Sequence, residues 1–286
     1  ALPVAEPSTD QTYTLDNTVP TLNSFARSNP SGTTTNADTL TFLATFSEAV
    51  LNVDATDFVA NGSTATVSGV NQTSTTTYAI TISGGDLAAL NGTVGINLAG
   101  GQNIADAAGN AVAAGEPTPD ETYTLDNTAP TFSSITRNTP GSTPTNSDTL
   151  VFLATFSEAV ANVTAGDFTI NGATTATISS VTPTSTSTYQ ITISGGDLVG
   201  LNGTIGLNLA VGQDIADLAG NALAAGEPAT DQTYLLDNDA PGLTSFTRNT
   251  PPSTPTNADT LVFIATFDET VINVDVADFE VSGGST

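Results

Sequence analysis

The sequence predicts an all-β protein in which small β-sandwiches follow one another along the chain. Two observations support this fold class. The 286 residues repeat themselves at an interval of about 110 residues, and each interval consists of short β-type segments separated by turn residues. The interval is too long for a solenoid unit of about 20–50 residues and suits a small domain with its own core. The function is therefore expected to lie in the serial arrangement of these domains.

Two motifs mark the interval. TYTLDNTVPT, which ends at Thr21, returns as TYTLDNTAPT ending at Thr131 and as TYLLDNDAPG ending at Gly242. FLATFSEAV occurs twice and FIATFDETV once, at matching offsets. The ends are out of phase with the repeat, as expected for a window cut from a longer array. The predicted units are the last strand of a preceding repeat at 1–15, a first repeat at 16–125, a second repeat at 126–236 and the N-terminal part of a third repeat at 237–286.

The first three strands are predicted from the second repeat. TFSSITR at 131–137 has apolar residues among polar ones, as in a strand with one buried face. TLVFLATF at 149–156 is a run of branched and aromatic residues, which favour strands. A short segment follows at 167–170. The turn cluster NTPGSTPTNSD separates the first two strands.

Four further strands complete the repeat. TTATISSV at 174–181, TYQITIS at 188–194 and GTIGLNLA at 203–210 alternate apolar and polar residues, and 232–236 closes the unit. Turn sequences such as SGGD and DLAGN lie between them, and only 196–200 and 217–225 could form a helical turn.

Seven strands in about 110 residues is the number in an immunoglobulin-like sandwich. We therefore predict tandem seven-stranded immunoglobulin-like β-sandwiches in an extended array, with an up-and-down strand order. The expected core of the second repeat is apolar and aromatic, and consists of Phe132, Phe152, Phe156, Phe168, Ile178, Tyr189, Ile191, Ile193, Ile205, Leu207 and Tyr234.

The composition excludes several classes of function. The net charge is −26, with 29 acidic residues against three basic ones, so neither nucleic acid nor an anionic membrane surface is an expected partner. Cysteine and histidine are absent, which excludes disulfides, thiolate or imidazole metal sites, and a histidine-activated nucleophile. No enzymatic activity is predicted. The carboxylates and amide carbonyls suit hard cations such as calcium.

The three arginines also recur. Arg27, Arg137 and Arg248 each precede an aspartate by 11 residues, at Asp38, Asp148 and Asp259. In an antiparallel sandwich, this spacing predicts a structural ion pair across the turn between the first two strands. Such an exposed pair is worth about 0–1 kcal/mol, so it bears on register and not on function.

Recurring acids are expected to meet at one pole of each sandwich. In an antiparallel arrangement, the segment before the first strand and the loops after even-numbered strands lie at the same pole. This rule brings together residues distant in sequence, namely Asp126, Asn127, Glu158, Asp167, Asp214, Asp217 and Asn221. The turn with Asp197 lies at the opposite pole and abuts the next repeat, as does the turn with Asp86. Crowded carboxylates repel unless they splay, protonate or bind a cation.

The hypothesis from these residues is one or more calcium ions at each junction, since calcium takes six to eight oxygen ligands. The alternative is that the acids solvate loops, with Asp126 and Asp217 acting as turn caps.

The motifs DNTAPT, FSEAV, GGDL and DLAGNAL together resemble tandem bacterial immunoglobulin-like repeats of very large surface adhesins of the biofilm-associated type. The resemblance implies an extracellular or cell-surface protein whose repeats extend an adhesive tip from the cell, with calcium at domain junctions. The calcium ligands that it implies here are Asp16, Asn17, Glu48 and Asp106; Asp126, Asn127, Glu158 and Asp217; and Asp237, Asn238 and Glu269.

The predicted function is a non-catalytic structural or adhesive segment of a fibre protein, whose partners are adjacent repeats. Three alternatives remain open. The chain could self-assemble into an extracellular filament with neighbouring copies, by strand complementation between the incomplete ends. It could bind carbohydrate or ice through threonine-rich strands such as TSTTTY, although surface tryptophan is absent. Paired carboxylates could hydrolyse glycosides. No membrane insertion is expected in this segment.

Overall fold

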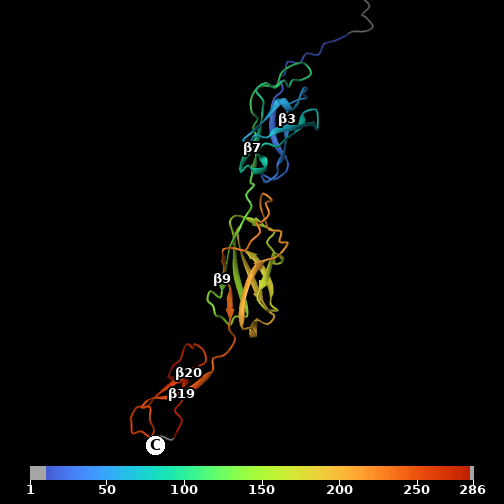
Figure 1. Ribbon diagram of the computed structural model, residues 1–286. Coiled ribbons are helices and arrows are strands. Elements are labelled where there is room, and N and C mark those ends of the chain that lie inside the picture. Colours follow the sequence, from blue (N-terminus) through green and yellow to red (C-terminus); the bar gives the residue numbers. More distant parts are fainter. Residues whose placement is uncertain (1–10, 284–286) are drawn as a thin grey trace, which may run out of the picture.

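The computed structural model describes residues 11–283. They form a row of three bodies, one for each predicted repeat (Figure 1). Residues 1–10, which hold most of the predicted preceding strand, lie outside the described residues, and 11–15 form no strand. No helix within 11–283 has the length and apolar character needed to cross a membrane.

The first repeat contains two four-stranded sheets, in the orders β1-β3-β6-β5 and β2-β8-β7-β4. Two short 3-10 helices, η1 (Ala55–Asp57) and η2 (Leu87–Ala89), lie in its loops. The strands are β1 (Leu22–Asn29), β2 (Thr34–Thr35), β3 (Thr39–Phe46), β4 (Phe58–Asn61), β5 (Thr66–Gln72), β6 (Thr77–Ser83), β7 (Gly92–Leu98) and β8 (Tyr123–Leu125).

The second repeat has sheets in the orders β13-β14-β10-β9-β17 and β12-β15-β18, and a small β11-β16 pair. Its 3-10 helices are η3 (Ala165–Asp167) and η4 (Leu198–Gly200). The strands are β9 (Phe132–Thr139), β10 (Thr149–Phe156), β11 (Val160–Ala161), β12 (Phe168–Asn171), β13 (Thr177–Pro183), β14 (Thr188–Ser194), β15 (Gly203–Leu209), β16 (Ala216–Asp217), β17 (Thr230–Asp231) and β18 (Tyr234–Leu236).

The predicted fold class is confirmed, but the predicted up-and-down order is wrong. In the second repeat β10 lies between β9 and β14, and β12 pairs with β15 in the other sheet. The seven main strands thus divide four and three, as in an immunoglobulin constant-type sandwich. The order differs because the chain crosses to the other sheet after β10 and again after β12 and β14. Both sheets then contribute an apolar face to one core. Neighbouring strands of each main sheet, β17 apart, are still antiparallel, so the loops still divide between two poles as predicted.

Each complete repeat packs its own core. One set of buried side chains runs from Leu22 to Leu125, and another from Phe132 to Leu236. Every predicted core residue of the second repeat is buried, except Ile178, which is partly buried against that core. A core mutation in one repeat should therefore leave the other folded.

Tyr234 lies at the centre of the second core and is fully buried. Its ring makes an edge contact with Phe152, with 4.9 Å between centroids. Its hydroxyl donates toward Pro140 O at 2.8 Å and Val151 O at 2.9 Å. Tyr123 has the same contacts in the first repeat. The buried hydroxyl of each tyrosine thus has hydrogen-bond partners in the backbone.

The predicted arginine–aspartate pairs are wrong. Arg27 lies 3.6 Å from Glu121 instead of pairing with Asp38, and it donates to Thr122 O at 2.9 Å. Arg137 donates to the matching carbonyl in the second repeat. The reason is the sheet order, because the segment just before the last strand runs parallel to the first strand and reaches its arginine.

The third repeat forms an antiparallel pair, β19 (Leu243–Thr250) with β20 (Val262–Phe267), and a 3-10 helix η5 (Val276–Asp278). Its register matches that of β9 with β10. Phe263 is 57% exposed, whereas its counterpart Phe152 is fully buried. Strand pairing alone therefore does not bury the core residues of a repeat.

Candidate metal centre

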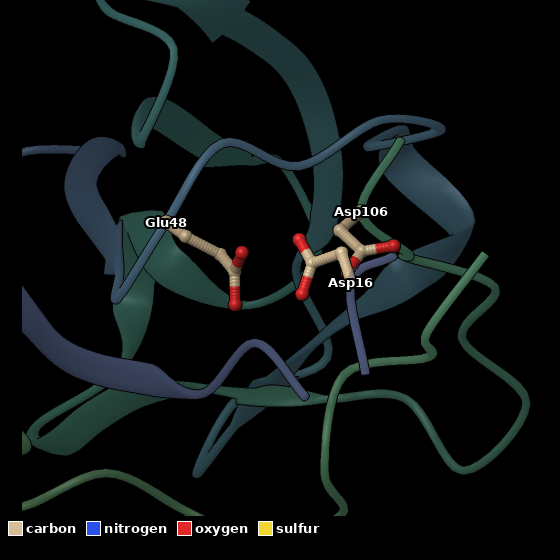
Figure 2. A group of neighbouring side chains, drawn as sticks. All are labelled: Asp16, Glu48 and Asp106. Carbon is tan, nitrogen blue, oxygen red and sulfur yellow. The ribbon is translucent and has the colours of Figure 1, made fainter. Parts of the chain in front are cut away.

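Two groups of carboxylates converge in the structure. The first acidic cluster is Asp16, Glu48 and Asp106, and the second acidic cluster is Asp126, Glu158 and Asp217. In each, one oxygen from every side chain lies within 4.8 Å of the others. Figure 2 shows the carboxylates of Glu48 and Asp16 turned toward each other, with Asp106 beside them. Oxygens about 2.4 Å from one calcium ion lie at most about 4.8 Å apart, so this spacing suits shared coordination.

The fold brings these residues together from distant segments. Asp126 precedes β9, Glu158 lies between β10 and β11, and Asp217 ends β16. These are the positions that strand alternation places at one pole. The structure therefore brings together six of the residues implied as ligands, three in each complete repeat.

Asp217 also organises the turn that follows it. One oxygen accepts from the N–H groups of Ala219, Gly220 and Asn221 at 2.7–2.8 Å, and the other accepts from Asn221 Nδ2 at 2.8 Å. Asp126 Oδ1 accepts from Thr128 N–H at 3.0 Å. The turn-cap role considered for Asp126 and Asp217 is thus present together with the cluster. The two roles are compatible, because Asp217 Oδ2 accepts only one hydrogen bond and an oxygen of this kind has two lone pairs.

Asp106 has matching bonds in the first repeat. Its oxygens accept from Asn110 Nδ2 and from the N–H groups of Ala108 and Asn110. The Asn110 side chain is the main cause that lowers the pKa of Asp106. Hydrogen bonds to the ionised form favour it, so Asp106 remains a negative charge in the cluster at neutral pH.

The glutamates experience the opposite effect. Desolvation raises the pKa of Glu48, and the charges of Asp16 and Asp106 raise it further. Desolvation likewise raises the pKa of Glu158, followed by the charges of Asp126 and Asp217. The ionised form of each glutamate is therefore repelled by the other carboxylates of its cluster. A cation placed among the carboxylates would offset this repulsion.

Glu158→Gln is expected to stabilise the metal-free second repeat at pH 7. Because the pKa of Glu158 is raised, its contribution to stability is fully present below the ordinary value of 4.5 and is lost as the pH rises through the raised pKa. The glutamine variant lacks this loss. Urea unfolding in metal-free buffer at pH 4 and pH 7 tests the prediction, with Asp148→Asn as an exposed control in the same repeat. A variant less stable than the wild type at pH 7 would contradict it.

The side-chain amides of Asn127 and Asn238, which follow the linker aspartates, are bonded to the preceding repeat. Asn127 Nδ2 donates to Leu87 O at 3.0 Å and to Leu90 O at 2.7 Å, in the preceding repeat. Asn238 makes the same two bonds at the next junction. The structure thus uses Asn127 and Asn238 to attach the linker to the repeat before it. It records no side-chain bond for Asn17 among the described residues.

The third repeat gathers acids at the matching pole. Desolvation raises the pKa of Glu269, followed by the charges of Asp237, Asp268 and Asp239. Asp268 accepts from the Gly242 N–H at 2.7 Å, where the other repeats use the hydroxyl of a serine. The additional acid at 268 therefore replaces a serine that caps the start of the first strand.

Other acids placed at the junction have local roles. Asp86 accepts from Ser63 Oγ and Thr64 N–H within its own repeat, and Asp197 makes the equivalent bonds. Asp167 is buried and accepts from Thr164, forming a capping box for η3. None of these three acids belongs to a group of converging carboxylates among the described residues.

Sequence reasoning missed Asn36 altogether. Its side chain donates to Asn221 Oδ1 at 3.0 Å, across the boundary between the first and second repeats. The sequence does mark this position, because asparagine recurs there in all three repeats, at Asn36, Asn146 and Asn257. Asn221 was expected at the acidic pole, and it lies there, bonded to Asp217 and to Asp126 O.

No protein-family model and no curated protein matches the chain. Among solved structures, it is similar to the D0-D1 domain of intimin, with 12% identity, a TM-score of 0.23, and coverage of 74% of this chain and 93% of that one. It is also similar to domains 4-9 of the surface layer protein SbsC, with 15% identity, a TM-score of 0.21, and coverage of 80% of this chain. The match spans 33% of the SbsC fragment.

Proposed function

We propose that this chain is a non-catalytic spacer segment of an extracellular or cell-surface bacterial fibre protein, in which calcium at each junction joins neighbouring repeats. The repeats follow one another in a row without specialised insertions, which suits a part that provides length. The resemblance of the motifs to adhesin repeats supports the extracellular location. The proposed partner of each repeat is the next repeat in the same chain.

The observation that carries the proposal is the position of Asp126. Its N–H donates to Thr35 O of the first repeat at 3.0 Å, and the next residue, Asn127, is bonded to Leu87 O and Leu90 O of the same repeat. Asp126 is therefore attached to the first repeat, although its carboxylate belongs to the second acidic cluster.

The other members of that cluster belong to the second repeat. Glu158 follows β10 and Asp217 lies in β16. A cation held by all three carboxylates would join the two repeats directly. Asp237 is attached to the second repeat in the same way, since its N–H donates to Thr145 O at 3.0 Å. The attachment of the linker aspartate to the preceding repeat thus recurs at the next junction.

The donor set suits calcium. Three carboxylates supply hard oxygen ligands, and backbone carbonyls and water would complete a shell of six to eight. Magnesium requires near-ideal octahedral geometry and gives up its water reluctantly, so it should bind more weakly here. The charge of the ion would offset the repulsion that raises the pKa of Glu158.

Calcium is expected to raise the melting temperature of both complete repeats. At a free concentration of about 100 times Kd, one site stabilises its repeat by about 2.7 kcal/mol. Differential scanning calorimetry with calcium, magnesium or EDTA measures the effect, and small-angle scattering measures particle length. Glu48→Gln should abolish the effect in the first repeat and Glu158→Gln in the second, whereas Asp148→Asn should not. Identical melting of the wild type in calcium and in EDTA would refute the calcium site.

Filament formation by strand complementation has less support. Tyr13 and Leu15 are 96% and 85% exposed, although they match the buried Tyr123 and Leu125 of β8. A strand of this sequence needs a β7 counterpart to pair with. Within the described residues, the third repeat contains no such strand. The spacer function remains the proposal.

A further inference from the structure

A second contact crosses the first junction without any carboxylate from the clusters. The loop between β2 and β3 of the first repeat meets the turn at 217–221 of the second. Asn36 N–H donates to Ala219 O at 3.1 Å, and Asn36 Nδ2 donates to Asn221 Oδ1 at 3.0 Å. A Cβ atom at Gly220 would lie 3.4 Å from Asn36 Oδ1, so the two surfaces are in close contact.

The orientation of the Asn221 amide follows from its neighbours. Its Nδ2 donates to Asp126 O and to Asp217 Oδ2, both at 2.8 Å, and neither atom can donate in return. The Oδ1 of Asn221 must then face the other way, where only Asn36 supplies a donor among the described residues. One side chain of the first repeat thus completes a network that holds two members of the second acidic cluster.

We propose that Asn36 is a positioning residue that sets the orientation of the second repeat on the first, before any cation binds. Its two bonds to Ala219 and Asn221 form a clamp on the Asp217 turn, called here the Asn36 clamp. The clamp acts through Asn221, which holds the backbone of Asp126 and the carboxylate of Asp217 in place. Two hydrogen bonds that end on one turn specify a direction as well as a distance.

The chain contains its own controls. Asn146 occupies the matching position in the second repeat and is exposed. Asn110 is the counterpart of Asn221, with the same bonds to Asp106 and to Asp16 O. No residue of the described chain supplies Asn110 with an equivalent of Asn36. The first acidic cluster therefore shows the behaviour of the network without the clamp.

Amide hydrogen exchange by NMR on the whole chain in metal-free buffer tests the clamp. In the wild type, the backbone amide at position 36 should be protected, because it donates to Ala219 O across the junction. Asn36→Ala should speed its exchange roughly 3- to 10-fold, the effect of losing one hydrogen bond. Asn146→Ala should leave it unchanged. The strand amides of β3 and β10 should stay protected in both variants, which distinguishes a loosened junction from unfolding.

Two results would overturn the proposal: an unprotected amide at position 36 in the wild type, or equal exchange there in the wild type and Asn36→Ala.

A calcium titration tests the coupling of the clamp to the cluster, and this part rests on the proposed function. Asn36→Ala should weaken calcium binding at the second acidic cluster roughly 5-fold or more, and leave the first unchanged, because binding and orientation are linked. Equal affinities at the second cluster in the wild type and the variant would refute the coupling. If the wild type binds no calcium, the proposed function fails, while the exchange experiment still decides on the clamp.

Discussion

Tyr234→Ala is expected to unfold the second repeat while the first remains folded. The side chain is fully buried, and its removal leaves a cavity against Phe152 and removes the hydroxyl that bonds to Pro140 O or Val151 O. Aromatic-to-alanine changes in cores cost about 3–5 kcal/mol, a large part of the 5–15 kcal/mol that stabilises a typical domain. The first repeat should be unaffected, because its core is built from other residues.

Calorimetry with separate transitions for the two repeats measures this effect. Tyr123→Ala should give the reciprocal result, with loss of the first transition. Tyr13→Ala is the matched control, since Tyr13 occupies the same place in the motif but is 96% exposed. A single transition that shifts as a whole in Tyr234→Ala would show that the repeats unfold together, contrary to the separate cores.

Asp217→Ala should both destabilise the second repeat and abolish its response to calcium. Three backbone N–H groups and the amide of Asn221 lose their acceptor. Hydrogen bonds to a charged group are worth about 1.5–3 kcal/mol each and are not additive, so we expect a loss of about 3 kcal/mol. The second acidic cluster also loses its most buried member.

Asp217→Asn separates these two effects. The amide oxygen can still accept from the backbone of the turn, so much of the stability should return, but the charge needed for a cation is lost. The melting temperature of each variant in calcium and in EDTA provides the measurement. An asparagine variant whose second repeat gains as much stability from calcium as the wild type would show that the charge of Asp217 does not contribute to binding.

The positions of most strands could be predicted from the sequence, because each strand has a recognisable pattern of residues of its own. Alternation and branched residues locate β10, β14 and β15 to within a residue. The order of strands within the sheets could not be predicted in the same way. Whether the second neighbour of β10 is β12 or β14 depends on which apolar faces meet in the core, and the alternation of residues is the same in both arrangements.

The convergence of Asp126, Glu158 and Asp217 could be predicted because it requires only antiparallel strands and loop positions. The orientation of individual side chains could not. Asn127 carries both donors and an acceptor, so its partners depend on which carbonyls lie nearby, and those belong to the preceding repeat. The spacing of Arg27 and Asp38 predicts the wrong partner, because Glu121 is distant from Arg27 in sequence and adjacent to it in space.

The parallel pairs β2 with β8 and β9 with β17 bear on how the chain responds to tension. In each complete repeat, the chain enters near one pole and leaves near the other, so a pull on its ends draws such paired strands past each other along their axes. The hydrogen bonds between them then share the force at the same time, instead of opening one after another as in a peeled hairpin. A protein exposed to flow would gain mechanical resistance from this geometry alone, whether or not its junctions hold an ion.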